Sequence, residues 1–336
     1  MARLRIMALW MLLGLTACGG AGGGNAVLLP TPTRDLVAYF EPTLVSPGTA
    51  ANPLQLLFVP PDPTAVGDAV GVLSNALVTR SGVNLQFVTL ATDAEALAIL
   101  CDYNDGSRFA AAWLNAPSLA IADANGCGDI VLQAVRGTSP SLRTQIVTRR
   151  SVGALSNLRG QTFCRLDESD FYSWVMPNLI LQANRFDPTS LGNVREYGTY
   201  PELFNAFVDN TCAATGIPAG LLDSDTLDAA AVSAVSVTIE SVPIPYGVLV
   251  VPPELLLGAR EALITALLDV AGLPDGTPLT PEDEPPTINP ALLTPEQAAL
   301  FSLLGAESVV RATRADFEDV YSFMAATGLN LTEFAR

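Results

Sequence analysis

The sequence predicts an α/β protein that is folded into two lobes. From residue 54 onward, short apolar runs typical of buried strands alternate with segments of helical periodicity, a pattern that favours mostly parallel sheets. The alternation is interrupted by an extended segment at 144–150 and then begins again. A second long segment at 232–251, which we expect to be extended, can return the chain to the first lobe. Two such crossings are typical of two lobes that are joined by two hinge strands and close around a ligand.

Composition and charge exclude several classes of function. The chain has 336 residues, enough for two domains, and its 49% hydrophobic content is that of a globular protein. A net charge of −17 argues against a nucleic-acid partner, because duplex binding depends on basic residues. The chain has no His and every basic residue is Arg, so His-based catalysis and His-based metal sites are excluded. We expect no enzyme activity, no cofactor and no metal site; a carboxylate-dependent enzyme remains the alternative.

The first eighteen residues have the pattern of a secretory signal. Arg3 and Arg5 precede an apolar stretch from Ile6 to Leu15, which is too short to span a bilayer. The stretch ends in Leu-Thr-Ala-Cys, which resembles a bacterial lipobox, so we expect Cys18 to be lipidated. The alternative is an ordinary signal peptide that happens to contain Cys. Residues 19–50 are then a flexible tether, and the protein is anchored to the outer face of the bacterial cell membrane.

Four cysteines remain after Cys18, an even number that favours disulfides in an exported chain. Four cysteines allow three pairings. We prefer Cys101–Cys127 with Cys164–Cys212, because each bridge then stays within one half of the chain. Zinc is the rival interpretation, but CxxC spacing and His are both lacking.

The first lobe is predicted to comprise residues 51–144 together with 244–275. Its expected elements are a strand LQLLFV at 54–59, a helix from Val66 to near Gly82, a strand LQFVTL at 85–90, a helix capped by Thr92 that runs through Leu100, and strands at 109–113 and 129–135. A further helix is expected from Pro253 to about Val270.

The second lobe is predicted to comprise residues 145–243. Its expected elements are a short helix at 155–159, a strand at 161–166, a helix near 177–183, a strand at 192–197 and a helix capped by Thr199 that runs through Asp209. Residues 276–336 are predicted to be an acidic, Pro-rich linker followed by C-terminal helices, with Thr313 as a cap and Gly328 as an end.

Several local patterns, in this order, resemble a known family. They are FVPPDP at 58–63, FAAAWLNAPSLAIA at 109–122, ALSNLRGQTFCRLDESDFYSWVMP at 154–177, FVDNTCAATG at 207–216 and IPYGVLV at 244–250. Over residues 52–275 the chain resembles the substrate-binding lipoproteins of ABC importers, and most of all their phosphate/phosphite/phosphonate-binding family, which has a type 2 periplasmic-binding fold. The resemblance implies a monomeric solute receptor that captures a small molecule between its lobes and docks on ABC permease subunits. A surface sensor or scaffold lipoprotein with the same fold is the alternative.

The chain departs from this family where the ligand should sit. The family's Ser-Thr-Ser hydroxyls, which hold a phosphonate, align with Asp170, Phe171 and Tyr172, and a His of the family falls near Tyr200. The acidic residue of aminophosphonate binders falls near Ala213. A carboxylate at Asp170 would repel a dianion, so we expect a ligand other than phosphate or a simple phosphonate. An organic ligand with a cationic nitrogen, held among aromatic side chains, fits the residues better.

The predicted ligand-binding residues lie on turns that should face the ligand. They are Asp62, Trp113, Asn115, Asp170, Phe171, Tyr172 and Tyr200. Each has a structural alternative: Trp113 as core, Asp62 as part of a proline turn, Asp170 as a helix cap and Tyr200 as packing. DYNDGS at 102–107 resembles a calcium loop, but its spacing is off by one and favours a turn.

Overall fold

The computed structural model describes residues 46–102, 110–273 and 292–331. The chain divides into two units, Met1–Leu44 and Val45–Arg336. All the described residues belong to the second unit. The predicted signal peptide, Cys18, the tether up to residue 45, most of the DYNDGS segment and the linker up to residue 291 lie outside the described residues. Within the described ranges, no helix has the length and apolar character needed to cross a membrane.

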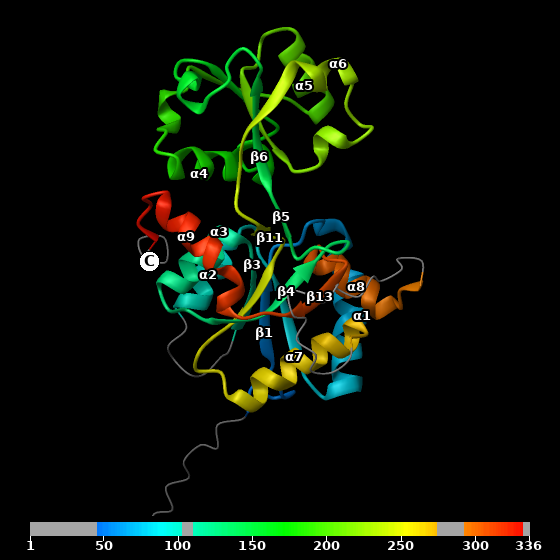
Figure 1. The fold of residues 1–336 in the computed structure, drawn as a ribbon. Helices are drawn as coiled ribbons and strands as arrows, with labels where there is room; N and C mark the ends of the chain where they lie inside the picture. Colours follow the sequence, from blue (N-terminus) through cyan, green and yellow to red (C-terminus); the bar gives the residue numbers. More distant parts are fainter. Residues whose placement is uncertain (1–45, 103–109, 274–291, 332–336) are drawn as a thin grey trace, which may run out of the picture. The chain divides into compact units, whose positions relative to one another are not determined.

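The first sheet has six strands in the order β13-β4-β12-β3-β1-β2 (Figure 1). Its strands are β1 (Leu54–Phe58), β2 (Leu85–Thr89), β3 (Ala110–Leu114), β4 (Asp129–Val135), β12 (Val248–Val251) and β13 (Ser308–Arg311). β1 is parallel to β2 and β3, whereas β12 is antiparallel to β3 and β4, and β13 is antiparallel to β4. The chain therefore leaves this sheet after β4 and returns to its centre as β12.

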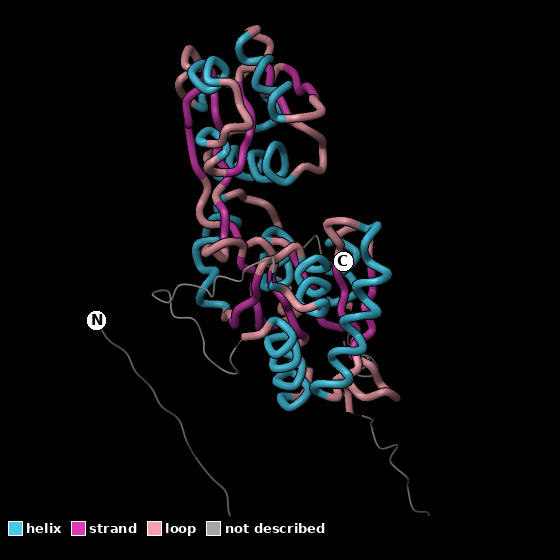
Figure 2. The backbone as a smooth tube through the Cα atoms, turned by 90° about the vertical axis from the view of Figure 1, so that its right-hand side faces the viewer, coloured by secondary structure: helices cyan, strands magenta, loops and turns pink. Residues whose placement is uncertain are grey.

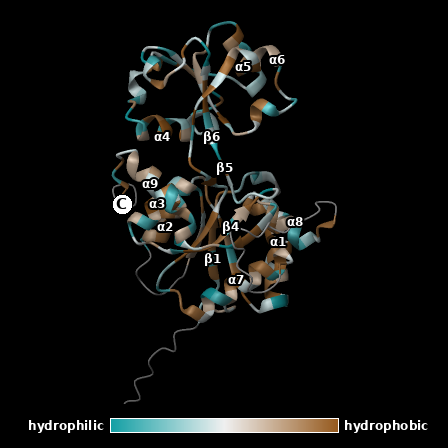
Figure 3. Ribbon diagram, viewed as in Figure 1, coloured by the Kyte–Doolittle hydropathy of each residue, from teal (hydrophilic) through white to brown (hydrophobic). Residues whose placement is uncertain are grey.

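Helices cover both faces of the first sheet (Figure 2). They are α1 (Val66–Ser81), α2 (Asp93–Cys101), α3 (Ala116–Ala124), α7 (Leu257–Ala271), α8 (Pro295–Leu304) and α9 (Glu318–Ala326). Leu56 of β1 packs in the cluster formed with α1, α7 and α8, while the adjacent Leu57 packs with α2, α3 and α9. Because successive side chains of a strand point to opposite faces, a strand covered on both sides is apolar throughout, and the strands are mostly hydrophobic in Figure 3.

The second sheet has five strands in the order β10-β6-β9-β7-β8. Its strands are β6 (Thr144–Arg149), β7 (Thr162–Arg165), β8 (Asn193–Glu196), β9 (Ala214–Pro218) and β10 (Val235–Glu240). Its helices are α4 (Met176–Ala183), α5 (Tyr200–Val208) and α6 (Ala229–Ala234), and short 3-10 turns lie at Leu155–Leu158, Pro188–Ser190 and Leu221–Asp223. One core cluster contains α5 and α6, and another contains Ile180 and Leu181 of α4.

Two chain segments join the sheets, as the sequence predicts. β5 (Ser141–Leu142) lies between β4 and β6, and β11 (Ile244–Pro245) lies between β10 and β12. The two pair antiparallel, with Ile244 opposite Leu142. The predicted α/β fold with two lobes is therefore confirmed.

Some local predictions differ from the structure. Residues 116–124, for which the sequence analysis gives no helix, form α3, which Asn115 caps. Residues 232–251 are not one extended segment: α6 includes residues 232–234, and β11 is only two residues long, with Pro243 before it and Pro245 as its second residue. The C-terminal segment has the expected helices and also β13, an edge strand whose partner β4 lies far away in the sequence. Residues 46–50, expected at the end of the tether, are bonded to the lobe: Asn84 N donates to the Gly48 carbonyl at 2.8 Å.

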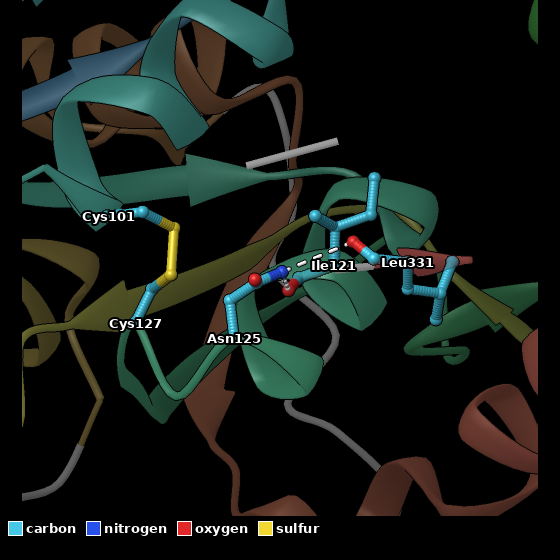
Figure 4. Close-up of a disulfide and its surroundings, with 5 residues drawn as sticks. All are labelled: Cys101, Ile121, Asn125, Cys127 and Leu331. Atoms are coloured by element: carbon cyan, nitrogen blue, oxygen red, sulfur yellow. Dashed lines mark hydrogen bonds between the residues drawn. A yellow bond between two sulfur atoms is a disulfide. The ribbon is translucent and has the colours of Figure 1, made fainter. Parts of the chain in front are cut away.

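Both disulfides join cysteines that follow one another in the sequence. Cys101 at the end of α2 bonds Cys127 before β4, with Cα atoms 4.8 Å apart, and Cys164 of β7 bonds Cys212, with Cα atoms 5.8 Å apart. Close to the first disulfide, Asn125 Nδ2 donates to the carbonyl oxygens of Ile121 at 2.8 Å and Leu331 at 3.2 Å (Figure 4). The end of α3 thus holds the C-terminal segment beside this disulfide.

Removing either disulfide should destabilise the protein substantially. The bridges close loops of 26 and 48 residues. In the chain-entropy model, opening them costs about 3.5 and about 4 kcal/mol of unfolding free energy. We expect the double variants Cys101→Ala/Cys127→Ala and Cys164→Ala/Cys212→Ala to show these losses in denaturant unfolding. Equal midpoints for the variants and the oxidised wild type would contradict the expectation.

Candidate ligand-binding site

The candidate site is built on the start of the helix that follows β7. A single π-helical turn, η3 (Phe171–Val175), leads directly into α4, and Asp170 is its N-cap. Asp170 Oδ1 accepts the backbone N–H of Ser173 at 2.6 Å. The buried Ser173 hydroxyl in turn accepts the N–H of Leu166 at 2.9 Å. A helix start is a ready-made anion site, and here the chain's own carboxylate occupies it.

A close backbone approach fixes the position of this turn. Gly216 of β9 lies against the Tyr172 carbonyl oxygen and the Pro177 ring so closely that a Cβ on residue 216 would overlap both. β9 is held on its other side by β6, through the pairing of Gly216 with Ile146. The glycine therefore sets how near η3 sits to the sheet, and with it the positions of Phe171 and Tyr172.

Two tyrosines lie beside Asp170. Tyr172 packs edge-on against Phe171, with ring centroids 5.2 Å apart. Tyr200 is the first residue of α5, and its hydroxyl is buried without a hydrogen-bond partner among the described residues. Burial raises the pKa of both phenols; the Asp170 charge raises both further. Both phenols are therefore neutral at physiological pH, and the Tyr200 hydroxyl is a buried donor without a partner among the described residues.

Arg136 and Tyr246, two residues that the sequence analysis missed, stack on each other. Arg136 follows β4, and its guanidinium lies 4.6 Å from the centroid of the Tyr246 ring, beyond β11. Its Nε donates to the Gly305 carbonyl at 2.7 Å. The Arg136 charge counteracts the burial that raises the pKa of Tyr172. No motif marks Arg136, because its partners Tyr246 and Gly305 are more than a hundred residues away in the sequence.

Asn115 has internal partners. Its Oδ1 accepts the Ser118 N–H at 3.0 Å as the cap of α3, and its Nδ2 donates to Asp93 at the start of α2. Burial raises the pKa of Asp93 to about 6, against the lowering effect of the Asn115 hydrogen bond. The pair therefore ties two helix starts of the first lobe together.

Asp62 and Trp113 have internal partners of their own. Asp62 is exposed and caps its own turn (η1, Pro63–Ala65): Oδ1 accepts the Thr64 N–H at 2.8 Å and the Thr64 hydroxyl at 2.6 Å, and these bonds lower its pKa. Trp113 is only 6% exposed and packs in the core of the first sheet against Gly247. Of the seven predicted residues, the structure brings together Asp170, Phe171, Tyr172 and Tyr200. Within the described ranges, no group of three or more acids or cysteines is arranged to hold a metal ion.

The family of the chain follows from a comparison with family models. Residues 62–317 match the model described as "ABC transporter, phosphonate, periplasmic substrate-binding protein". This match covers most of the chain, so the chain belongs to the phosphonate-type periplasmic substrate-binding proteins of ABC transporters. Proteins of this family bind a small molecule outside the cytoplasm and work with ABC transporter components. A search of the curated proteins finds no matching relative.

Solved structures show the same fold at low sequence identity. XAC2383 from Xanthomonas citri, bound to chloride ion, has a TM-score of 0.56 at 14% identity and covers 82% of this chain and 97% of its own. Mh-p37 of Mycoplasma hyorhinis has a TM-score of 0.53 at 8% identity, over 82% of this chain and 98% of its own. PhnD1 from Prochlorococcus marinus, in complex with methylphosphonate, has a TM-score of 0.50 at 11% identity, over 82% and 98%. The predicted type 2 periplasmic-binding fold is confirmed.

Adding a methyl group at residue 216 should disturb the site and the fold together. We expect Gly216→Ala to lower the unfolding free energy by about 1–3 kcal/mol, because β9 or η3 must shift to admit the Cβ. Gly71→Ala is the matched control: it lies in α1 with nothing near its Cβ, and should raise stability by up to about 1 kcal/mol. Denaturant unfolding measures both. Equal effects of the two substitutions would contradict the close approach.

Asp93 should make stability depend on pH. Its folded pKa of about 6 lies above the ordinary value of 3.8, so the folded protein holds the proton more tightly than the unfolded chain. The contribution of Asp93 is most favourable below about pH 4 and declines as the pH rises through 6. We expect Asp93→Asn to flatten this part of the pH–stability profile and to raise stability at pH 8. Asp68→Asn, on the exposed first turn of α1, is the control and should leave the profile unchanged.

Proposed function

We propose that this substrate-binding protein captures a small organic ligand with a cationic nitrogen, and not phosphate or a simple phosphonate. The observation that carries the proposal is the hydrogen bond from Ser173 N to Asp170 Oδ1. A phosphonate at this helix start would meet a carboxylate that already accepts the N–H it needs. The same carboxylate attracts a cation.

The side chains around Asp170 support this choice of ligand. Phe171 stands where the family has a hydroxyl and has no hydrogen-bond donor, whereas Tyr172 and Tyr200 offer aromatic faces as well as hydroxyls. Aromatic faces attract cations, by about 0.5–2 kcal/mol for each well-placed contact. The chain's net charge of −17 adds a long-range preference for cationic over anionic solutes.

The related structures give the contrast. The structure of PhnD1 contains methylphosphonate, and Mh-p37 is described as a putative thiamine pyrophosphate transporter. In this chain Asp170 caps the helix start that follows β7. We propose that this carboxylate keeps an anionic group from binding there.

The mechanism we propose is capture without chemistry. Residues 51–144 with 244–275 form one lobe and residues 145–243 the other, and the β5–β11 pair at the crossing supports these boundaries. A ligand that contacts both lobes favours their closure, since binding shifts the equilibrium by the difference in affinity between the two states. The closed monomer docks on the ABC permease while a lipid on Cys18 holds it at the outer face of the cell membrane.

A ligand screen of residues 19–336 tests this proposal. We expect thermal stabilisation by organic amines in a panel of polyamines, thiamine-like cations and amino acids, and none by phosphate or methylphosphonate. Asp170→Ser keeps a helix cap and restores a hydroxyl of the family, but removes the charge. It should weaken amine binding by about tenfold or more, the worth of a charge-assisted hydrogen bond.

Asp167→Ser is the matched control for Asp170→Ser. Asp167 caps the preceding turn by accepting the Ser169 N–H at 2.8 Å, is exposed, and lies three residues from Asp170. It should leave amine binding unchanged. Stabilisation of the wild type by phosphate or methylphosphonate would overturn the proposed function.

A further inference from the structure

Helix α4 packs against both lobes with different faces. Ile180 and Leu181 face the sheet of their own lobe, in a cluster with Phe163 of β7. Met176 and Leu179 lie instead in the cluster that the first sheet forms with α2, α3 and α9, and they are only 1% and 8% exposed. The helix therefore contributes buried apolar side chains to the core of the other lobe.

The C-terminal helix α9 is the part of the first lobe that packs against α4. Val320 and Met324 of α9 are buried in the same cluster as Met176 and Leu179. Phe323, which is partly buried, packs against this cluster and also against the core cluster on the other face of α4. The α4–α9 contact is therefore an apolar contact between the lobes, formed by elements other than the β5–β11 crossing.

Polar contacts on both sides of α9 fasten it to the first lobe. Before the helix, Arg314 Nε donates to Asp123 Oδ1 at 2.7 Å, and Nη2 of the same guanidinium donates to Oδ2 at 3.1 Å. After the helix, the Leu331 carbonyl accepts a hydrogen bond from Asn125 Nδ2 at 3.2 Å. Asp123 and Asn125 belong to the end of α3. Because α9 is held on the first lobe and α4 on the second, a movement of one lobe against the other acts on the α4–α9 contact.

The α4–α9 contact is continuous with the turn that begins the candidate site. η3 leads directly into α4, and Asp170 is its cap. Phe171, the first residue of η3, is partly buried and packs against the same first-lobe cluster as Met176 and Leu179. The arrangement that keeps α4 on α9 therefore also keeps this helix start beside the first lobe.

We propose that α9 is a latch between the lobes: its contact with Met176 and Leu179 of α4 holds the two lobes together, in addition to the β5–β11 crossing. Apolar side chains that are buried between the lobes return to water when the lobes separate, so the contact favours the arrangement in which it is intact. Packed apolar surfaces change between discrete arrangements and do not stretch gradually. The lobes thus have a latched and a separated arrangement, whatever the charge of the ligand.

Distances between spin labels on the two lobes test the latch in residues 19–336. Cysteines introduced by Asp68→Cys on α1 and Asp225→Cys between β9 and α6 carry the labels; both positions are exposed, and the four native cysteines of this segment are in disulfides. We expect Leu179→Ala to raise the ratio of separated to latched molecules by about tenfold or more, as the burial of a leucine side chain provides. Phe323→Ala, on the other side of the contact, should act in the same direction, and the combined variant should show the largest separated population.

Leu181→Ala is the matched control for Leu179→Ala. It is the same substitution on the same helix, but Leu181 is fully buried in the core of its own lobe. It should lower the unfolding free energy and leave the distances between the lobes unchanged. Circular dichroism verifies that each variant is folded, and if Leu179→Ala is not, Phe323→Ala decides alone. Unchanged distances in the folded contact variants, or an equal change in Leu181→Ala, would overturn the latch and leave the proposed function standing.

Discussion

The antiparallel pairing of β5 with β11 is the constraint on which the rest of the molecule depends. Each lobe contains a sheet with its own hydrophobic clusters, and each sheet receives the chain twice. The paired crossing brings Ser141–Leu142 beside Ile244–Pro245, although a hundred residues separate them. It also brings Arg136 and Tyr246, which flank these short strands, into stacking contact. The same pairing thus connects the lobes and positions Arg136 against Tyr246.

The candidate site is built around a helix start that Asp170 caps. Backbone N–H groups at such a position attract an anion, and proteins of this fold can use them for a ligand. Here Asp170 supplies the anion from within the chain. Under the proposed function, this carboxylate makes the helix start favour a positively charged group over a phosphonate.

The residues discussed here come from segments beside both sheets. Asp170 with Tyr200 belongs to the second sheet, and Arg136 with Tyr246 to segments beside the first. Gly305, from the C-terminal segment, orients the guanidinium through its carbonyl. β13 holds that segment on β4, so the C-terminal part of the chain also contributes to the geometry of the site.

The sequence by itself determined the local features: strand periodicity, the caps at Thr92, Thr199 and Asp170, and the order of elements that indicates two lobes. These depend on residues a few positions apart, and therefore can be predicted from a sequence. Tertiary structure decided the rest: Trp113 packs in the core, residues 308–311 form β13, and Arg136 stacks on Tyr246. Each of these outcomes depends on partners more than a hundred residues away in the chain, and no local pattern records such a pairing.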